Sequence, residues 1–223
     1  MPTVEQLKLV NSGITLAEAV YETLLESIVS GDLASGTVLS EVAVAKDLAV
    51  SRTPVHDALR QLAKDGLVDQ AAGRRARVAD FSRDDVFEIF EMRKFLEGPA
   101  AELAASRMDR RQLIPLRMAA NDLAQNRETE DWLSKWINHD EEFHSVLAKA
   151  SGNSRLWKDI ANYRQLHRGL NRISTNVEFL QAALAEHQAI LDALESGDPQ
   201  AARSTMIAHL DAWPDNFVRH FPR

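Results

Sequence analysis

The chain has 223 residues, of which 45% are hydrophobic and 26% charged, as in a soluble globular protein with room for two modest domains. It contains no cysteine, so disulfides and thiolate metal sites are excluded, and any metal ligands must be His, Asp or Glu. No apolar run approaches the roughly 18 residues that span a bilayer, and no signal-peptide pattern opens the sequence. We therefore expect a cytoplasmic protein without membrane contact.

The formal net charge of −7 argues, taken alone, against a nucleic-acid partner. Residues 15–80 are acidic as well, with seven Lys/Arg against ten Asp/Glu, a net charge of −3. Residues 70–79 are the exception, because Arg74, Arg75 and Arg77 stand there without an acid. A DNA-binding surface would therefore be a local basic feature of an acidic domain.

The N-terminal part of the chain predicts three helices. Residues 1–14 show no periodic pattern and are predicted to be an arm. Leu16–Val29 has helical apolar spacing and is followed by Gly31, a C-terminal capping residue. A second helix is predicted from about Glu41 to Leu48, and a third from Ser51 to about Lys64. A tight turn joins the last two, and this arrangement is typical of a helix-turn-helix.

The third predicted helix separates an apolar face from a polar one. Val55, Leu59 and Leu62 form the apolar face, and Pro54 stands in the first turn, where its missing N–H costs nothing. The polar residues near its start, which we assign to DNA contact, are Ser51, Arg52, Thr53 and His56. Such a helix fits the major groove, with Ser51 as its N-cap. Periodicity alone leaves an ordinary amphipathic surface helix as an equal alternative.

A hairpin is predicted directly after this helix. Gly66 ends the helix, and Leu67-Val68 and Arg77-Val78 are expected to pair around Gly73. A hairpin in this position is a wing, and its three arginines and Gly73 are assigned to DNA, where arginines enter a minor groove or clamp phosphates. A solvated, arginine-rich turn is the alternative.

The rest of the chain has helical spacing and almost no strand signal. Ser82 and Asp85 have the spacing of a capping box. Helices are predicted over 84–107, 109–126, 129–151, 154–175, 177–196 and 198–217, with breaks at Ser151-Gly152-Asn153 and Gly197-Asp198-Pro199. The fold class is therefore mainly α: a winged helix-turn-helix domain over 15–80, then an all-helical bundle over 81–223.

Four polar residues of the helical domain are predicted to converge. Asp140 and His144 are four apart on one helix, so their side chains face the same way. His187 and His209 lie on two later helices among apolar neighbours. Buried imidazoles need partners for both nitrogens, and one divalent metal ion would satisfy all three and the carboxylate. Each histidine taken singly is more often structural, and spacing alone favours that alternative.

The residues around the third helix carry a family resemblance. At the family's spacing stand Gly31-Asp32-Leu33 with Gly36, Leu39-Ser40-Glu41, Ser51 to Val55, Ala58-Leu59 with Leu62, and Asp65 to Val68. The segment 24–78 thereby resembles the winged helix-turn-helix domain of the GntR family of bacterial transcription regulators. The resemblance implies double-stranded operator DNA as a partner, with Arg52 on a base and Ser51 and Thr53 on backbone or sugar oxygens. Glu41 is expected to cap its helix rather than read a base.

Residues 82 to about 217 resemble the all-helical effector-binding domain, of the FCD type, in the FadR-like branch of that family. The residues that carry the resemblance are Glu91-Met92-Arg93 with Leu96-Glu97, Asp140 to His144, Ser151 to Asn153, Glu186-His187 with Ile190, and Gly197-Asp198 through Ala201 to His209. In metal-binding members an Asp, a His four residues on and two later His form the site. The resemblance therefore assigns a divalent metal ion to Asp140, His144, His187 and His209. Zinc is expected, with nickel, manganese and iron as alternatives.

The same resemblance implies a small organic acid as effector, bound at the open positions of the metal with the help of a cationic side chain. Arg93 is the main candidate for that cation, because it matches an arginine of the family. Arg164, Arg168 and Arg172 share or neighbour one helical face, and Arg164 and Arg168 are the further candidates. For Arg164 and Arg172 a solvated surface position is the favoured alternative.

These resemblances imply a homodimeric, ligand-responsive transcription regulator, most often a repressor in this family, and not an enzyme. Two alternatives stay open. One is a sensor for which the metal ion itself is the signal. The other, less favoured because no second general base is evident near the four ligands, is a metal-dependent enzyme fused to a DNA-binding domain.

The chain departs from the family pattern at two positions of the surface that is expected to contact DNA, here called the reading surface. His56 stands where members commonly carry Arg, and Val42 stands where some place a DNA-contacting Arg. A neutral imidazole offers one donor where a guanidinium offers five. We therefore expect one charged DNA contact to be lost or to depend on pH.

Overall fold

The structure is a computed structural model that describes residues 15–70, 75–174 and 177–215, without the side chains of residues 168–174. The predicted arm and the tip of the predicted wing, with Gly73 and Arg74, lie outside the described residues. The chain divides into two compact units. The first extends to Asp85 and includes Leu166–Ser174; the second holds Val86–Gln165 and the described residues from 177 on.

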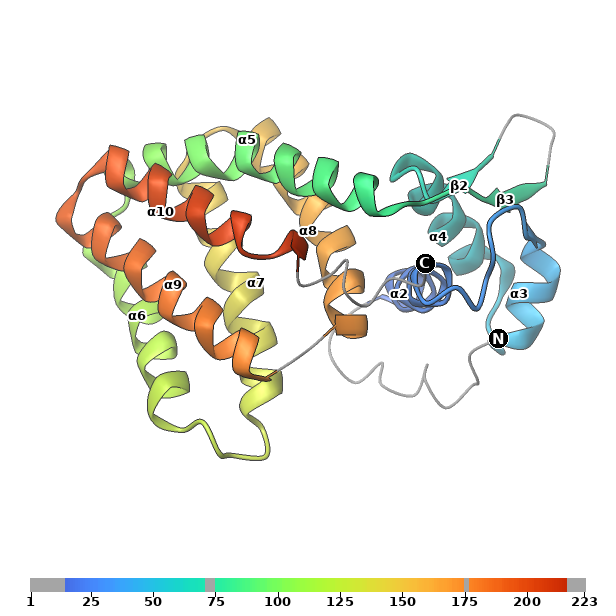
Figure 1. The fold of residues 1–223 in the computed structure, drawn as a ribbon, viewed down its shortest axis with the longest axis horizontal. Helices are drawn as coiled ribbons and strands as arrows, with labels where there is room; N and C mark the ends of the chain where they lie inside the picture. Colours follow the sequence, from blue (N-terminus) through green and yellow to red (C-terminus); the bar gives the residue numbers. More distant parts are fainter. Residues whose placement is uncertain (1–14, 71–74, 175–176, 216–223) are drawn as a thin grey trace. The chain divides into compact units, whose positions relative to one another are not determined.

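The first unit contains the helices and strands of a winged helix-turn-helix (Figure 1). Its elements are α2 (Leu16–Val29), β1 (Val38–Leu39), α3 (Glu41–Asp47), α4 (Arg52–Lys64), β2 (Val68–Asp69) and β3 (Ala76–Val78). Helix α2 packs along α4, and the Tyr21 hydroxyl donates to Asp65 Oδ2 at 2.7 Å. The three helices predicted from the sequence are confirmed. The apolar face of α4 is confirmed too, since Val55, Leu59 and Leu62 are fully buried.

The strands form an antiparallel sheet in the order β1-β3-β2. In its register Arg77 faces Val38 of β1 and Asp69 of β2. The predicted pairing of β2 with β3 is confirmed. Strand β1 was not predicted, because two residues are too few to show an alternating pattern.

The turn between α3 and α4 holds the two helices of the reading motif close together. Ala49 has a φ of 53°, the left-handed region that non-glycine residues rarely adopt. Ser51 directly precedes α4 with extended backbone, so its predicted position as N-cap is confirmed. Its side chain makes no capping hydrogen bond, which leaves the hydroxyl exposed for another partner.

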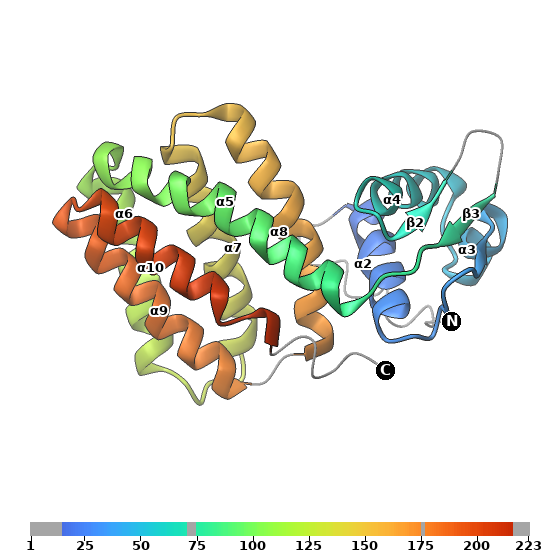
Figure 2. The same ribbon diagram turned by 45° about the horizontal axis from the view of Figure 1, so that its top comes forward.

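The second unit is built from helices (Figures 1 and 2). They are α5 (Arg83–Arg107), α6 (Arg110–Gln125), α7 (Trp132–Ala150), α8 (Ser154–Ser174), α9 (Val177–Ser196) and α10 (Pro199–Asp211), with the start of α5 and the end of α8 assigned to the first unit. Helix α9 packs against α6 and α10. The predicted capping box of α5 is confirmed, since Ser82 N donates to Asp85 Oδ2 at 2.7 Å. Helix α10 ends earlier than predicted, because Pro214 disfavours the helical conformation at the residue before it.

Helices α5 and α10 approach closely at Gly98. A Cβ atom at this position would lie 3.1 Å from Cγ1 of Ile207, which is tighter than ordinary van der Waals contact. The glycine therefore sets how near α10 can lie to α5. None of the helices in the described part of the chain combines the length and apolar character that a membrane span requires.

Candidate functional site

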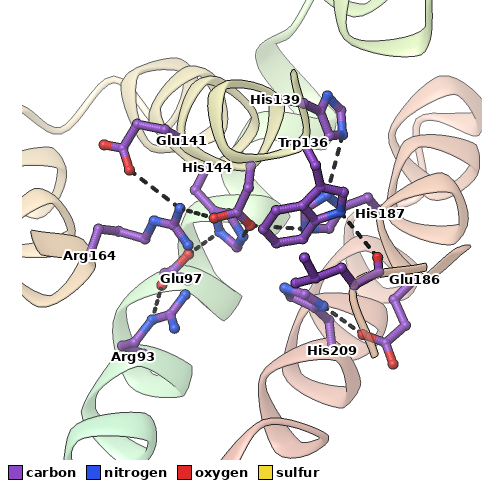
Figure 3. Close-up of polar contacts among 12 residues, drawn as sticks. Arg93, Glu97, Trp136, His139, Glu141, His144, Arg164, Glu186, His187 and His209 are labelled. Atoms are coloured by element: carbon purple, nitrogen blue, oxygen red, sulfur yellow. Dashed lines mark hydrogen bonds and ion pairs between the residues drawn. The ribbon is translucent and has the colours of Figure 1, made fainter. Parts of the chain in front are cut away.

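Three histidines from three helices meet inside the second unit (Figure 3). His144 lies on α7, His187 on α9 and His209 on α10, and each is at most 1% exposed. One ring nitrogen of each lies within 4.8 Å of the others. Asp140 joins them, because its Oδ1 lies 3.7 Å from Nε2 of both His144 and His187. The structure thus brings together all four residues that the sequence assigned to a metal.

Each histidine makes an outer contact through Nδ1, on the side away from the centre of the cluster (Figure 3). The Nδ1 atom of His144 contacts Glu97 Oε2, and that of His209 contacts Glu186 Oε2 at 2.7 Å. The Nδ1 atom of His187 contacts His139 Nε2 at 3.3 Å. A carboxylate accepts hydrogen bonds, so Nδ1 of His144 and His209 carries the proton. Their Nε2 lone pairs are then free to bind a metal ion.

The atoms that point into the cluster lack partners. Nε2 of His144, Nε2 of His187 and Oδ1 of Asp140 are buried without a hydrogen bond. Burial, followed by the field of Arg164, lowers the pKa of His144 to about 4, although Glu97 opposes the shift. Burial and the neighbouring histidines lower the pKa of His187 well below its usual value. Both rings are therefore neutral near pH 7, the form that ligates metals.

A buried ion pair fixes the carboxylate of the cluster. Arg164 Nη2 donates to Asp140 Oδ2 at 2.5 Å, and Arg164 is 2% exposed. Burial alone would raise the pKa of Asp140, but the charge and the hydrogen bond of Arg164 outweigh it and hold the pKa below its usual value. Asp140 is therefore ionised, with Oδ2 held by Arg164 and Oδ1 directed at the histidines. The solvated surface position favoured for Arg164 from the sequence is wrong.

Arg93 lies beside the cluster with the donors of both its terminal nitrogens unused. Its Nε donates to Glu97 Oε1 at 2.8 Å, while Nη1 and Nη2 are buried without a partner. Arg93 and Glu97 are 1% and 3% exposed. Burial would raise the pKa of Glu97, but Arg93 and His144 reverse the effect and hold it far below the usual range. The side chains of the other two arginine positions, 168 and 172, lie outside the described residues.

Aromatic side chains cover the histidines on one side. Phe143 stacks on His187 with ring centroids 4.1 Å apart, and Trp136 stacks on the same ring at 6.4 Å. These rings shield one side of the cluster from solvent, while Glu97 and Arg164 lie on its other sides. In such surroundings electrostatic attraction to an ion or a charged ligand is stronger than in water.

The predicted DNA-reading residues lie together at the start of α4. Ser51, Arg52, Thr53 and His56 are all exposed. On the wing, Arg75 directly precedes β3, the strand that returns to the sheet, and it is exposed. Arg77 is exposed on β3, and its Nη1 donates to the Gly36 carbonyl at 3.0 Å. Arg77 therefore braces the loop before β1 and belongs to a paired strand rather than to the tip.

Glu41 has a different role from the one predicted. It begins α3, but its carboxylate reaches α4, where Oε2 contacts Arg52 Nη2 at 3.1 Å and Oε1 contacts His56 Nδ1 at 2.8 Å. The expectation that Glu41 caps its helix is wrong, because two cationic or donor groups on α4 compete for the carboxylate.

Sequence reasoning missed the outer partners of the histidines. These partners are Glu97, His139 and Glu186. Each lies next to, or one helical turn from, a residue that the sequence assigned to the metal or to the effector. Glu186 directly precedes His187, and Glu97 lies one turn from Arg93. These spacings were visible, but a sequence does not tell which helix a side chain will meet across the core.

A winged helix-turn-helix is a DNA-binding fold, and here a helical domain with a buried histidine cluster follows it, which points to a transcription regulator. Comparisons with known proteins give the family. Residues 16–78 match the gntR family of bacterial regulatory proteins, and residues 88–212 match the FCD domain. The chain belongs to the GntR family of transcription regulators, in the branch that carries an FCD domain.

Relatives of similar length support this assignment. An uncharacterized HTH-type transcriptional regulator in an unstable DNA locus of Streptomyces ambofaciens is 29% identical over 93% of this chain and 87% of its own. A probable D-xylose utilization operon transcriptional repressor of Paenarthrobacter nicotinovorans is 28% identical over 89% and 87%. The solved structure of Escherichia coli McbR/YncC has the same fold, with a TM-score of 0.66, 22% identity, and coverage of 92% and 98%.

Proposed function

We propose that this transcription regulator is a ligand-responsive repressor whose helical domain binds a divalent metal ion and, beside it, a small carboxylate effector. Asp140, His144, His187 and His209 would hold the ion, and zinc suits this donor set best, ahead of nickel, manganese and iron. When bound, the ion supplies an electrophilic centre that accepts a carboxylate oxygen. The relatives are regulators, and we propose no catalysis.

The observation that carries the metal proposal is the set of partnerless atoms at the centre of the cluster. Leaving a buried polar atom without a hydrogen bond costs about 1–3 kcal/mol, and Asp140 Oδ1 and two Nε2 atoms are in that state. One ion would satisfy all of them. Two ligands of an ion at about 2.1 Å are at most about 4.2 Å apart, so the present spacing of up to 4.8 Å needs only a small contraction.

The charge of the cluster favours an anionic effector. Arg93 and Arg164 are balanced by Glu97 and Asp140, and these four side chains are all buried. A divalent ion would add two positive charges to this balanced set, and a buried uncompensated charge is strongly unfavourable. Arg93 also presents Nη1 and Nη2, the two donors that a carboxylate accepts side by side. The proposed effector site also includes Arg164 and Arg168, the two further candidates named from the sequence.

The DNA-binding half follows from the family. We propose that two copies form a homodimer and that their α4 helices read two half-sites of a pseudo-palindromic operator. Arg52 would contact a base, with His56 beside it, while Ser51, Thr53 and the wing residues, Gly73 with Arg74, Arg75 and Arg77, contact the backbone or a minor groove. An effector that favours one arrangement of the dimer would change operator affinity about 5- to 150-fold.

A thermal-shift screen of small organic acids on metal-loaded protein tests this proposal. A binding acid at about 100 times its Kd is expected to raise the melting temperature by roughly 5–10 °C. The Arg93→Met variant should keep the metal but lose this shift, because the carboxylate then lacks its paired donors. Lys94→Met is the matched control. Lys94 follows Arg93 on α5 but contacts Asp211 of α10 outside the cluster, so its loss should not alter the response.

Two further measurements with the same acids, operator binding and product formation, separate the two remaining alternatives. If operator binding responds to a chelator but no acid changes either the melting temperature or DNA affinity, the protein senses the metal itself. If a purified acid is converted to product, it is an enzyme. Either result would overturn the effector proposal.

Replacing His56 by arginine is expected to strengthen DNA binding and steepen its salt dependence. His56 is exposed at the start of α4, so an arginine fits there and adds one cation to the reading surface. Each additional phosphate contact steepens the logarithmic salt slope by about 0.9. Fluorescence anisotropy over a range of salt concentrations measures this slope, and coinciding isotherms for the variant and the natural protein would contradict the expectation.

A further inference from the structure

The reading surface contains a carboxylate that the DNA-binding role does not explain. Glu41 on α3 lies between two side chains of α4, contacting Arg52 Nη2 at 3.1 Å and His56 Nδ1 at 2.8 Å. Its side chain is 25% exposed, against 68% for Arg52 and 48% for His56. An acid in a surface that approaches phosphates is unfavourable by charge alone. The contacts of Glu41 with Arg52 and His56 therefore cannot serve to strengthen binding to DNA, and another role is needed to explain them.

The charge state of Glu41 determines the tautomer of His56. The hydrogen bonds from His56 and then Arg52 lower the pKa of Glu41, so the carboxylate is ionised at neutral pH. An ionised carboxylate only accepts hydrogen bonds, so His56 must donate through Nδ1. In a neutral imidazole that carries its proton on Nδ1, Nε2 has a lone pair and accepts.

An acceptor at this position selects certain bases. In the major groove the hydrogen-bond donors of the bases are the amino groups of adenine, N6, and cytosine, N4, whereas guanine presents acceptors. When the His56 ring carries a single proton, on Nδ1, its Nε2 atom therefore suits adenine or cytosine and is repelled by guanine. An arginine at position 56 would have the opposite preference, since it only donates.

Glu41 also orients Arg52. Only Nη2 of that guanidinium contacts the carboxylate. The side chain can therefore present its other N–H groups to a guanine edge while its direction is held by α3. Val42, the residue next to Glu41, is 60% exposed and adds an apolar surface of the kind that contacts a thymine methyl group.

We propose that Glu41 is a positioning residue that determines sequence specificity: it holds His56 as an acceptor for the amino group of adenine or cytosine, and it aims Arg52 at a neighbouring guanine. The proposal rests on the DNA contacts of Arg52 and His56 proposed above. Glu41 lowers affinity for DNA in general and raises discrimination between sequences.

The test compares four variants, one of them His56→Ala, on defined DNA at about pH 8, which favours the uncharged form of imidazoles in general. The natural protein first selects its preferred sequence from a pool of random duplexes of about 30 base pairs, long enough for two half-sites. Glu41→Ala removes both contacts, and Glu41→Gln removes the charge but keeps an acceptor. Asp57→Asn is the matched control, because Asp57 is an exposed acid on α4 and its loss changes the net charge by the same amount.

Glu41→Ala is expected to bind unselected duplex more tightly, with a salt slope steeper by up to about one unit, as Asp57→Asn should too. The base pair that His56 reads is the one at which His56→Ala no longer discriminates between bases. At that base pair the natural protein and Asp57→Asn should prefer adenine or cytosine by about fivefold or more. Glu41→Ala should lose that preference, and Glu41→Gln should keep part of it. Full discrimination in Glu41→Ala, or a preference of the natural protein for guanine there, would overturn the proposal.

An independent measurement reads the tautomer directly. In protein labelled with ¹⁵N-histidine, the two ring nitrogens of His56 should report a proton on Nδ1, and Glu41→Ala should move it to Nε2. A proton on Nε2 in the natural protein would overturn the inference. If the natural protein selects no sequence at all, the proposed DNA reading itself fails. Circular dichroism and melting temperature confirm that each variant is folded.

Discussion

Replacing His187 and His209 together by alanine is expected to abolish stoichiometric metal binding. Both residues are fully buried and direct a nitrogen at the same point as His144, so the variant leaves one imidazole and one carboxylate for the ion. Elemental analysis after dialysis gives the metal content. Adding a chelator to the natural protein should lower its melting temperature by roughly 5–10 °C if metal is present at about 100 times its Kd, and should leave the variant unchanged.

A graded control comes from the outer partner of His209. Glu186→Gln removes the charge that orients this ring but keeps all four ligands, so metal affinity should fall about 10- to 100-fold without being lost. Stoichiometric metal in the double alanine variant would show that the ion binds elsewhere.

Replacing Glu97 by glutamine is expected to destabilise the protein by about 3–5 kcal/mol, since it leaves the buried charge of Arg93 without its counterion. Glu97 also contacts His144, so the ring loses its fixed orientation. Urea denaturation of metal-free protein measures the free energy of unfolding.

The matched control for this prediction is Glu102→Gln. Glu102 lies on the same helix and pairs with Arg203 at 2.8 Å, but both side chains are more than a third exposed. Exposed pairs contribute about 0–1 kcal/mol, so this variant should stay close to the natural protein. Equal losses in the two variants would show that the Glu97 pair contributes no more than a surface contact.

Local patterns predicted the elements of the fold and the core of the site. Val55, Leu59 and Leu62 repeat at helical spacing, and the structure buries all three. Asp140 and His144 are one turn apart, which places them on one face whatever the helix packs against. These properties depend on a single element, and for that reason they can be read from a sequence.

Properties that depend on two elements were not predictable in this way. Glu41 was expected to cap α3, but its carboxylate crosses to α4, because the distance between the helices is set by a turn that includes Ala49 in the left-handed conformation. Arg164 has the spacing of a solvated residue, yet it is buried against Asp140. In both cases a charge partner on another helix decided the outcome.

For an ion in the proposed site, the close approach at Gly98 would couple the metal–ligand distances to the packing of α5 against α10. Helix α5 carries Glu97, which orients His144, while α10 carries Ile207 against Gly98 and His209 half a turn further on. A methyl group at position 98 would push Ile207 away by a few tenths of an ångström. Metal–ligand distances tolerate about 0.2 Å. Under that proposal, a substitution at Gly98 would alter which ion the site prefers, although Gly98 is not one of the four proposed ligands.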